Sequence, residues 1–311
     1  MATVFPVASG QPNLSGIFIP EIWSGRLLEE YYKGTVFNAI ANTNWEGEIK
    51  DTGDTVHIRT TPHHPIHTYT KGQSLEIDTL TAPLVDLLID KGKYGSYLVE
   101  GVDKVQSDMN LMSDWAEGLA KDMNVAVDRE ILAYIPGQVS TTNKGTTAGA
   151  SSNYNLGTTG SIVQMTTSNI LLKLTQLGTV LDESDVPPEN RWVVIPPWFS
   201  NAILNSDLKN ATFAGTDKSI LIKQGLIGEI AGFQLFKSNN LTSISDGGNT
   251  AWNIVAGHMS GLTFAAQITE TRETEDAHVW GKIMQSMIVY GRKVVKDTAL
   301  AVLYCSDNTG N

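Results

Sequence analysis

The sequence predicts a fold of the α+β class, and three observations lead to this prediction. One apolar stripe at helical spacing runs through residues 103–135. Several stretches rich in Val, Ile and Tyr have the character of strands and lie on both sides of that helix. Strands and helices do not alternate in repeated βαβ units, which argues against a doubly wound sheet or an α/β barrel.

The composition is that of a globular protein with enough material for a core. The chain has 311 residues, of which 41% are hydrophobic and 18% are charged, so we expect one or two domains. No apolar run approaches the roughly 18 residues of a membrane span, and the N-terminus lacks the pattern of a signal peptide. We therefore expect a protein made and kept in a cytoplasm, with no membrane contact. Cys305 is the only cysteine, which excludes an intrachain disulfide and a CxxC motif.

The charge balance argues against a dedicated role in binding nucleic acid. The formal net charge is −11, and no run of Lys and Arg is present to neutralise phosphates.

The first hundred residues indicate an arm, a helix and a long loop. Residues 1–16 lack periodicity and are expected to form an extended arm, and a helix is expected between Pro20 and Gly34. "EGEIKDTGDTVHIRTT" alternates like a strand, and "LTAPLVDLLIDKGKYGSYLVEGVD" is a second strand-rich stretch. We expect two long strands joined by a loop of roughly 25 residues, a length that favours a loop held by a partner.

The strongest local pattern is the helix predicted for residues 103–135. Its apolar residues follow steps of three and four, and the Pro136-Gly137 pair is expected to end it. A helix of about 30 residues is about 45 Å long. With a single apolar stripe it must lie across something flat. A coiled coil is the competing interpretation, but the steps favour a period of 3.6 over 3.5.

The remainder of the chain predicts a compact mixed segment. Residues 137–161 are rich in Gly, Ser, Thr and Asn, which predicts a surface loop or linker and a domain boundary near residue 160. A helix is expected next, ending before Pro187, followed by a buried strand in "RWVVI" that leads into a Pro-started helix. Further strands are expected towards the C-terminus.

The segment "TTPHHPIHTYTKG", residues 60–72, raises the question of a metal site. Its histidines are His63, His64 and His67, with His57 just upstream. The flanking prolines keep the backbone extended, so that adjacent histidines point apart, and no acidic residue or cysteine is expected nearby as a third ligand type. The pattern favours loop histidines that are exposed or contact a partner. A metal site and a pH-sensitive contact are the alternatives.

Motifs for catalysis or phosphate binding are incomplete. "GHMSGL" has His258 where the nucleophile elbow needs Gly, and "GLIGEIAG" does not have the spacing of GxGxxG. "AGTDKS" lacks the second glycine of a P-loop. We therefore predict that the protein is not an enzyme and that it has no cofactor and no catalytic or metal-ligating residues.

The order of these elements resembles the major capsid protein of tailed bacteriophages, the Hong-Kong-97-type fold that encapsulins share. "IPEIWSGRLLEEYYKGTVF" is similar to the N-terminal helix phrase of that family, and "EGEIKDTGDTVHIRT" to the strand that enters its extended loop. "VDKVQSDMNLMSDWAEGLAKDMNVAVDREI" is similar to its spine helix and "GLIGEIAGFQLFKSNNL" to a phrase of its axial domain. "TETRETEDAHVWGKIMQSMIVYGRKVVKDTALAVLY" is similar to its closing strands. The resemblance runs from about residue 17 to residue 304.

The resemblance implies a division of the chain and a structural role. It implies an N-terminal arm with a short helix (1–45), an extended β-hairpin loop (46–98), a spine helix with the first part of a peripheral domain (99–160), an axial domain (161–262) and the closing strands of the peripheral domain (263–311). Many copies would form pentamers and hexamers that tile an icosahedral shell around the double-stranded DNA genome, in a virion assembled in the bacterial host cytoplasm. The shell would enclose DNA without sequence-specific binding.

The resemblance also implies partners. Some relatives carry an N-terminal scaffolding segment that is cleaved off, but the family phrases begin here at residue 17, so a separate scaffolding protein is expected. A portal protein and a decoration protein are further expected partners. Some relatives cross-link a loop Lys to an Asn in the closing strands. Lys71 lies at a plausible loop position, but no matching Asn is found, so non-covalent locking is expected.

The hairpin loop supplies the expected contacts between subunits. These contact residues are His57, Arg59, His63, His64, His67, Tyr69 and Lys71. An encapsulin-type nanocompartment is the alternative with the same fold, and a His-dependent metalloenzyme is the alternative from a different class.

Overall fold

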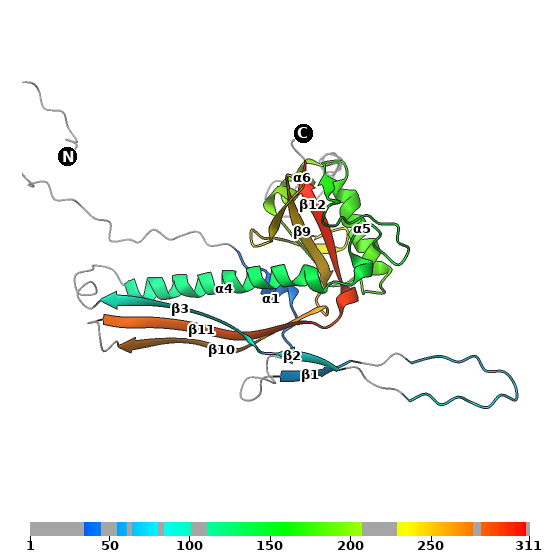
Figure 1. Cartoon of the computed structure of the whole chain (residues 1–311), viewed down its shortest axis with the longest axis horizontal. Helices are drawn as coiled ribbons and strands as arrows, with labels where there is room; N and C mark the ends of the chain where they lie inside the picture. The colour runs from blue at the N-terminus through cyan, green and yellow to red at the C-terminus, as the bar shows by residue number, and fades with distance from the viewer. Residues whose placement is uncertain are drawn as a thin grey trace, which may run out of the picture.

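The structure is a computed structural model that describes residues 34–44, 55–60, 64–79, 84–100, 111–206, 229–275 and 281–308. Helices and strands follow one another without βαβ repetition, which confirms the α+β class (Figure 1). The N-terminal helix predicted between Pro20 and Gly34 lies outside the described residues. Within these ranges no helix is both long and apolar enough to span a membrane.

The helices are α1 (Phe37–Ile40), α4 (Leu111–Gln138), α5 (Ile170–Asp182) and α6 (Pro197–Asn205), with the 3-10 helices η1 (Thr141–Asn143) and η2 (Asp297–Ala299). The strands are β1 (Thr55–Arg59), β2 (Leu84–Leu88), β3 (Lys91–Glu100), β4 (Val163–Met165), β5 (Arg191–Ile195), β6 (Glu229–Ile230), β7 (Phe233–Lys237), β8 (Ser243–Asp246), β9 (Asn249–His258), β10 (Leu262–Glu275), β11 (Gly281–Val294) and β12 (Leu300–Asp307).

The described strands form three sheets. β1 and β2 make a two-stranded antiparallel sheet, and β10, β11 and β3 make a three-stranded antiparallel sheet in that order. The largest sheet has the order β4-β12-β9-β5-β7-β6, with β8 paired to β9. The second strand-rich stretch of the sequence therefore divides between two sheets, since β2 pairs with β1 and β3 pairs with β11.

Helix α4 lies along both of the larger sheets (Figure 1). Its stripe includes Val127 and Ile131, which are fully buried in one cluster with Ile288 of β11 and Val255 of β9. The expectation that this helix lies across a flat surface is confirmed. The helix runs to Gln138, past the predicted end at Pro136, because a proline in the last turn removes only one backbone donor from a segment already packed on a sheet.

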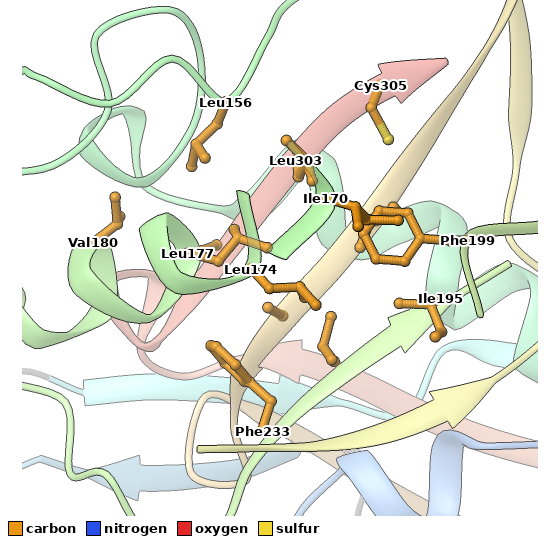
Figure 2. Close-up of a cluster of buried hydrophobic side chains, with 14 of the residues drawn as sticks. Leu156, Ile170, Leu174, Leu177, Val180, Ile195, Phe199, Phe233, Leu303 and Cys305 are labelled. Atoms are coloured by element: carbon orange, nitrogen blue, oxygen red, sulfur yellow. The ribbon is translucent and has the colours of Figure 1, made fainter. Parts of the chain in front are cut away.

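The opposite face of the largest sheet is covered by α5 and α6, as Figure 2 shows. Leu303 and Cys305 of β12 belong to this second core with Leu174 and Phe199, whereas Val302 belongs to the core beneath α4. With both faces covered, nearly every residue of β12 is buried, which is the pattern of a central strand.

Residues 137–161 are mostly exposed and, after the end of α4, irregular apart from η1, as expected for a surface loop. A few buried residues anchor this loop to the fold. Ala148 and Leu156 in this segment are fully buried. The amide of the buried Asn143 donates to the carbonyls of Thr298 (2.7 Å) and Leu300 (3.0 Å). Side-chain hydrogen bonds of this kind let an irregular chain bury itself, because they satisfy backbone groups that a strand or helix would otherwise pair.

Asp128 of α4 joins three parts of the chain through one buried carboxylate. Its Oδ1 accepts the backbone N–H groups of Val36 and Phe37, each at 2.9 Å, at the start of α1. Its Oδ2 accepts the side-chain N–H of Asn240, which follows β7, at 2.6 Å. The side chain is completely buried, so these three donors replace the water that a carboxylate otherwise needs.

We predict that Asp128→Ala lowers the free energy of unfolding of the purified, unassembled chain by about 3 kcal/mol, because it leaves three buried donors without an acceptor. Chemical denaturation measures the change. Asp122 is an exposed aspartate on the same helix, and Asp122→Ala should change stability by less than about 0.5 kcal/mol. Equal effects of the two substitutions would contradict the role given to Asp128.

Candidate subunit interface

The hairpin that begins with β1 and ends with β2 is seated on the three-stranded sheet. β1 and β2 pair in antiparallel register, with His57 opposite Asp86. Alternate residues of the pair, among them Val56, Ile58 and Leu87, are buried against Ala265 of β10. We call β1 and β2 the hairpin root, and this alternation gives the root one face on its own sheet and one face open to solvent.

The hairpin root approaches the sheet closely at Gly291 of β11. A Cβ atom at this position would lie 2.5 Å from the carbonyl oxygen of Leu88 and 3.2 Å from the Cα atom of Ile89. Both are backbone atoms that cannot rotate away. A residue without a side chain is therefore required where β2 crosses the sheet.

Residues 64–79 form the hairpin tip, which extends away from the rest of the molecule (Figure 1). The chain reverses in a turn where the N–H of Gln73 donates to the carbonyl of Thr70 at 3.0 Å and Gly72 has a φ of 89°. This is the position at which a type II turn requires glycine. Every residue of the tip is exposed. The tip therefore has no surface of its own chain to pack against.

Two histidines of the hairpin bind carboxylates on the opposite strand. His57 Nδ1 lies 2.6 Å from Asp86 Oδ1, and His67 Nε2 lies 2.6 Å from Asp78 Oδ2. His67 Nδ1 also lies 3.6 Å from Glu76 Oε2. The expectation that no acidic residue lies near these histidines was wrong, because the hairpin brings its two arms side by side and so joins residues that are apart in sequence. Each pair joins the two arms of the hairpin.

The predicted contact residues lie at different places along the hairpin. His57 and Arg59 are on the solvent face of the root, whereas His64, His67, Tyr69 and Lys71 are in the exposed tip. His63 lies outside the described residues. Among the residues that the structure describes, no cluster of three His, Cys, Asp or Glu side chains is arranged to hold a metal ion.

The most exposed apolar side chains of the tip were not among the predicted contacts. The exposed fraction is 91% for Ile66, 94% for Ile77 and 76% for Leu75. A signal was available, because Leu75 and Ile77 alternate with Glu76 and Asp78 as in a half-buried strand.

The three-stranded sheet has one face against α4 and one free face. On the helix side, Trp115 stacks edge-on against Tyr97 with ring centroids 5.7 Å apart. On the free face, Tyr94 of β3 lies opposite Met287 of β11, which lies opposite Glu270 of β10. The exposed fraction is 82% for Tyr94 and 41% for Met287. Two large apolar side chains on this face, Tyr94 and Met287, are thus left exposed.

A shallow groove runs across this free face. It is lined by Tyr94, Gly95, Ser96, Glu270, Arg272, Gln285, Ser286 and Met287. The hairpin root covers the same face of the sheet, but only at the near end, around Ala265 and Val289. In Figure 1 the sheet continues in one direction from the root, and the hairpin tip extends in the other.

Glu130 fixes the sheet beneath α4. One carboxylate oxygen lies 2.8 Å from Lys93 Nζ and accepts a hydrogen bond from the Tyr290 hydroxyl at 3.0 Å, and the other lies 2.8 Å from an Arg292 nitrogen. Burial raises the pKa of Glu130, but the hydrogen bonds and positive charges outweigh it and hold the pKa below its usual value. Burial, followed by the bond to Glu130, raises the pKa of Tyr290. Glu130 therefore links α4 to both β3 and β11.

Comparison with known proteins identifies this arrangement. The chain matches the family described as phage capsid protein over residues 87–303. A solved structure from Mycobacterium phage Che8 is similar, with 27% identity, a TM-score of 0.75 and coverage of 94% of this chain and 97% of that chain. The capsid of cyanophage P-SCSP1u is similar in fold, with 15% identity, a TM-score of 0.70 and coverage of 94% of each chain.

The capsid of Ralstonia phage GP4 is also similar in fold, with 14% identity, a TM-score of 0.65 and coverage of 98% of this chain and 100% of that chain. A comparison with curated protein sequences gave no match.

The fold is that of a subunit of a virus shell. The chain belongs to the phage capsid protein family, and it is a major capsid protein that forms the shell of a bacteriophage. The predicted family, fold and function are confirmed, and the virion capsid is the location of the protein.

We predict that Gly291→Ala loosens the hairpin root, because the new methyl group meets the backbone of Leu88. Overpacking of this kind should lower the free energy of unfolding by about 1–3 kcal/mol and raise the amide hydrogen exchange of β1 and β2. Gly92 of β3 is the control, since its nearest contact would be 4.0 Å away. Gly92→Ala should leave amide exchange in the hairpin root unchanged. Equal amide protection of the root in the two variants would contradict the close approach of β2 to Gly291.

Proposed function

We propose that the hairpin of one subunit lies over the free face of the three-stranded sheet of the next subunit. The observation that carries this proposal is that each chain exposes two apolar surfaces. These are the hairpin tip, with Ile66 and Ile77, and the part of the free face just beyond the hairpin root, with Tyr94 and Met287. Large apolar side chains that are exposed close together favour a contact with another protein.

The hairpin root supports the proposal, because it already packs on this face within one chain. Val56 and Ile58 cover the near end of the face, beside Val289. The hairpin tip of a neighbouring subunit would cover the rest of this face, next to the hairpin root that already packs there. In this arrangement Ile66, Leu75 and Ile77 lose their contact with water, which favours association by about 25 cal/mol for each Å² of apolar surface.

Charge supports the same pairing. Lys71 is exposed at the turn of the tip, and Glu270 is exposed on the free face near the groove. In this contact, polar interactions around Tyr94 and Met287 come from the hairpin residues His57, Arg59, His64, His67 and Tyr69. His63 belongs to this proposed set by its place in the sequence. The locking is non-covalent.

The directions of the two surfaces determine the symmetry. The tip and the free end of the sheet extend in opposite directions (Figure 1), so the contact joins different surfaces of the two partners. Head-to-tail contacts of this kind form closed rings when the rotation between subunits closes. Pentamers and hexamers are the rings from which an icosahedral shell is built, with residues 161–262 at their centres and the remaining domains at their edges.

The shell encloses a double-stranded DNA genome without reading its sequence. The net charge of −11 leaves the subunit without the clustered cations of a nucleic-acid-binding protein. Assembly takes place in the host cytoplasm with a separate scaffolding protein and a portal protein, and decoration proteins bind the finished shell. The role is structural, with no reaction catalysed.

We predict that the double substitution Ile66→Asp and Ile77→Asp prevents shell assembly and leaves the subunit folded. Both side chains are more than nine-tenths exposed in the subunit, so its stability should change by less than about 0.5 kcal/mol. Sedimentation and electron microscopy measure assembly, and circular dichroism checks the fold.

Ser74→Asp is the matched control, because Ser74 is an exposed residue of the same tip and the substitution adds a charge without removing an apolar side chain. This variant should assemble. Shells of normal yield and stability from the double variant would refute the proposed contact.

A further inference from the structure

Two connections cross between the largest sheet and the three-stranded sheet, and they are bonded to each other. One is the turn from β9 to β10 through Gly261, and the other is the segment from β11 to β12. The carbonyl of Gly261 accepts the N–H groups of Val295 at 2.9 Å and Lys296 at 3.4 Å. We call this pair of segments the crossing.

The crossing is tightly packed. A Cβ atom at Gly257 would lie 2.5 Å from Leu300 Cδ2 and 2.9 Å from the carbonyl oxygen of Ala299. At Gly261 it would lie 3.0 Å from the same Leu300 side chain. A change in the conformation of the β9–β10 turn therefore displaces the segment that joins β11 to β12.

His258 closes the turn at the crossing and must be neutral to do so. Its Nδ1 accepts the backbone N–H of Ser260 at 3.1 Å and lies 2.8 Å from the Ser260 hydroxyl oxygen. Its own carbonyl accepts the N–H of Gly261 at 2.9 Å. An imidazolium has a proton on both ring nitrogens, so protonation at Nδ1 removes the acceptor for Ser260.

Positive charge surrounds this histidine. Arg191 of β5 is its cross-strand partner, and Lys296 lies in the second connection. The Arg191 guanidinium cannot swing away, because it donates to Asp182 at 2.7 Å and to the carbonyls of Pro187 and Val186. Burial, then Arg191 and Lys296, lower the pKa of His258, and a backbone hydrogen bond with Glu189 acts in the opposite direction.

We propose that His258 makes the crossing an acid-sensitive hinge between the two sheets of the capsid subunit. Protonation breaks the bond to Ser260 and places a third positive charge beside Arg191 and Lys296, so that acid loosens the link between the sheets. The proposal does not depend on where the hairpin binds, because every group that it uses belongs to one chain.

The direction of the pH effect follows from linkage. With the crossing closed, His258 resists the proton, whereas in an opened crossing it has the ordinary histidine pKa of about 6.5. The opened form therefore takes up a proton first as the pH falls. The contribution of His258 to closing is fully present above about pH 6.5 and is lost as the pH falls below that value.

Hydrogen exchange of the full-length chain tests the hinge. Protection of the amides of residues 258–262 and 294–300 is compared at pH 7.5 and pH 5.5, after correction for intrinsic exchange rates. In the wild type the opening constant should rise on acidification, by at most about tenfold for each pH unit, which is the limit for one proton.

His258→Asn is the decisive variant, since the asparagine oxygen accepts an N–H two residues on in the same way and does not titrate. Its opening constant should stay flat over this range. A flat wild type, or an equal rise in His258→Asn, would overturn the proposal.

A second measurement covers the case in which His258→Asn disturbs the fold at pH 7.5. In an NMR titration of the wild-type chain, the His258 ring should take up its proton below pH 6.5, with the Ser260 amide shifting at the same midpoint. A midpoint at or above pH 6.5, or an unresponsive Ser260 amide, would overturn the proposal.

Discussion

The constraint on which the structure depends is a sheet face that carries exposed apolar side chains and is covered only in part by its own chain. The sheet of β3, β11 and β10 is covered by α4 on one side, but its other side is covered by the hairpin root only at the near end. Tyr94 and Met287 remain exposed just beyond the root, as do Ile66 and Ile77 on the hairpin tip. The two surfaces extend in opposite directions, so the tip of one chain cannot cover the sheet face of the same chain. We infer that a second copy of the chain covers each of them.

Such a contact is useful only if the two surfaces are held rigidly, and buried polar groups provide that rigidity. Glu130 ties α4 to β3 and β11, while Asp128 ties it to α1 and to Asn240 after β7. These carboxylates hold the elements of one chain together, whereas the exposed apolar side chains are proposed to form the contact between chains. The crossing at His258 is the place where the two larger sheets are joined by short connections, so a titratable group there affects their relative position.

The sequence predicted the elements whose pattern is periodic. The stripe of α4 and the buried strand β5 follow directly from the spacing of apolar residues, and the order of the elements was enough to indicate the capsid family. Features made by distant residues could not be predicted in this way. Asp128 looks like any other acidic residue of a helix, and nothing near His57 in the sequence points to Asp86, which lies 29 residues further on. The polar composition of residues 137–161 predicts a surface loop, but it does not show that the Asn143 amide anchors this loop by donating to the carbonyls of Thr298 and Leu300.

A cryo-electron microscopy map of the assembled shell tests the central claim most directly, because it shows what covers the free sheet face. The account predicts that residues 64–79 of one subunit lie over Tyr94 and Met287 of its neighbour, with Ile66 and Ile77 buried in the contact. A hairpin tip that lies in solvent, or that packs elsewhere and leaves Tyr94 and Met287 uncovered, would contradict it.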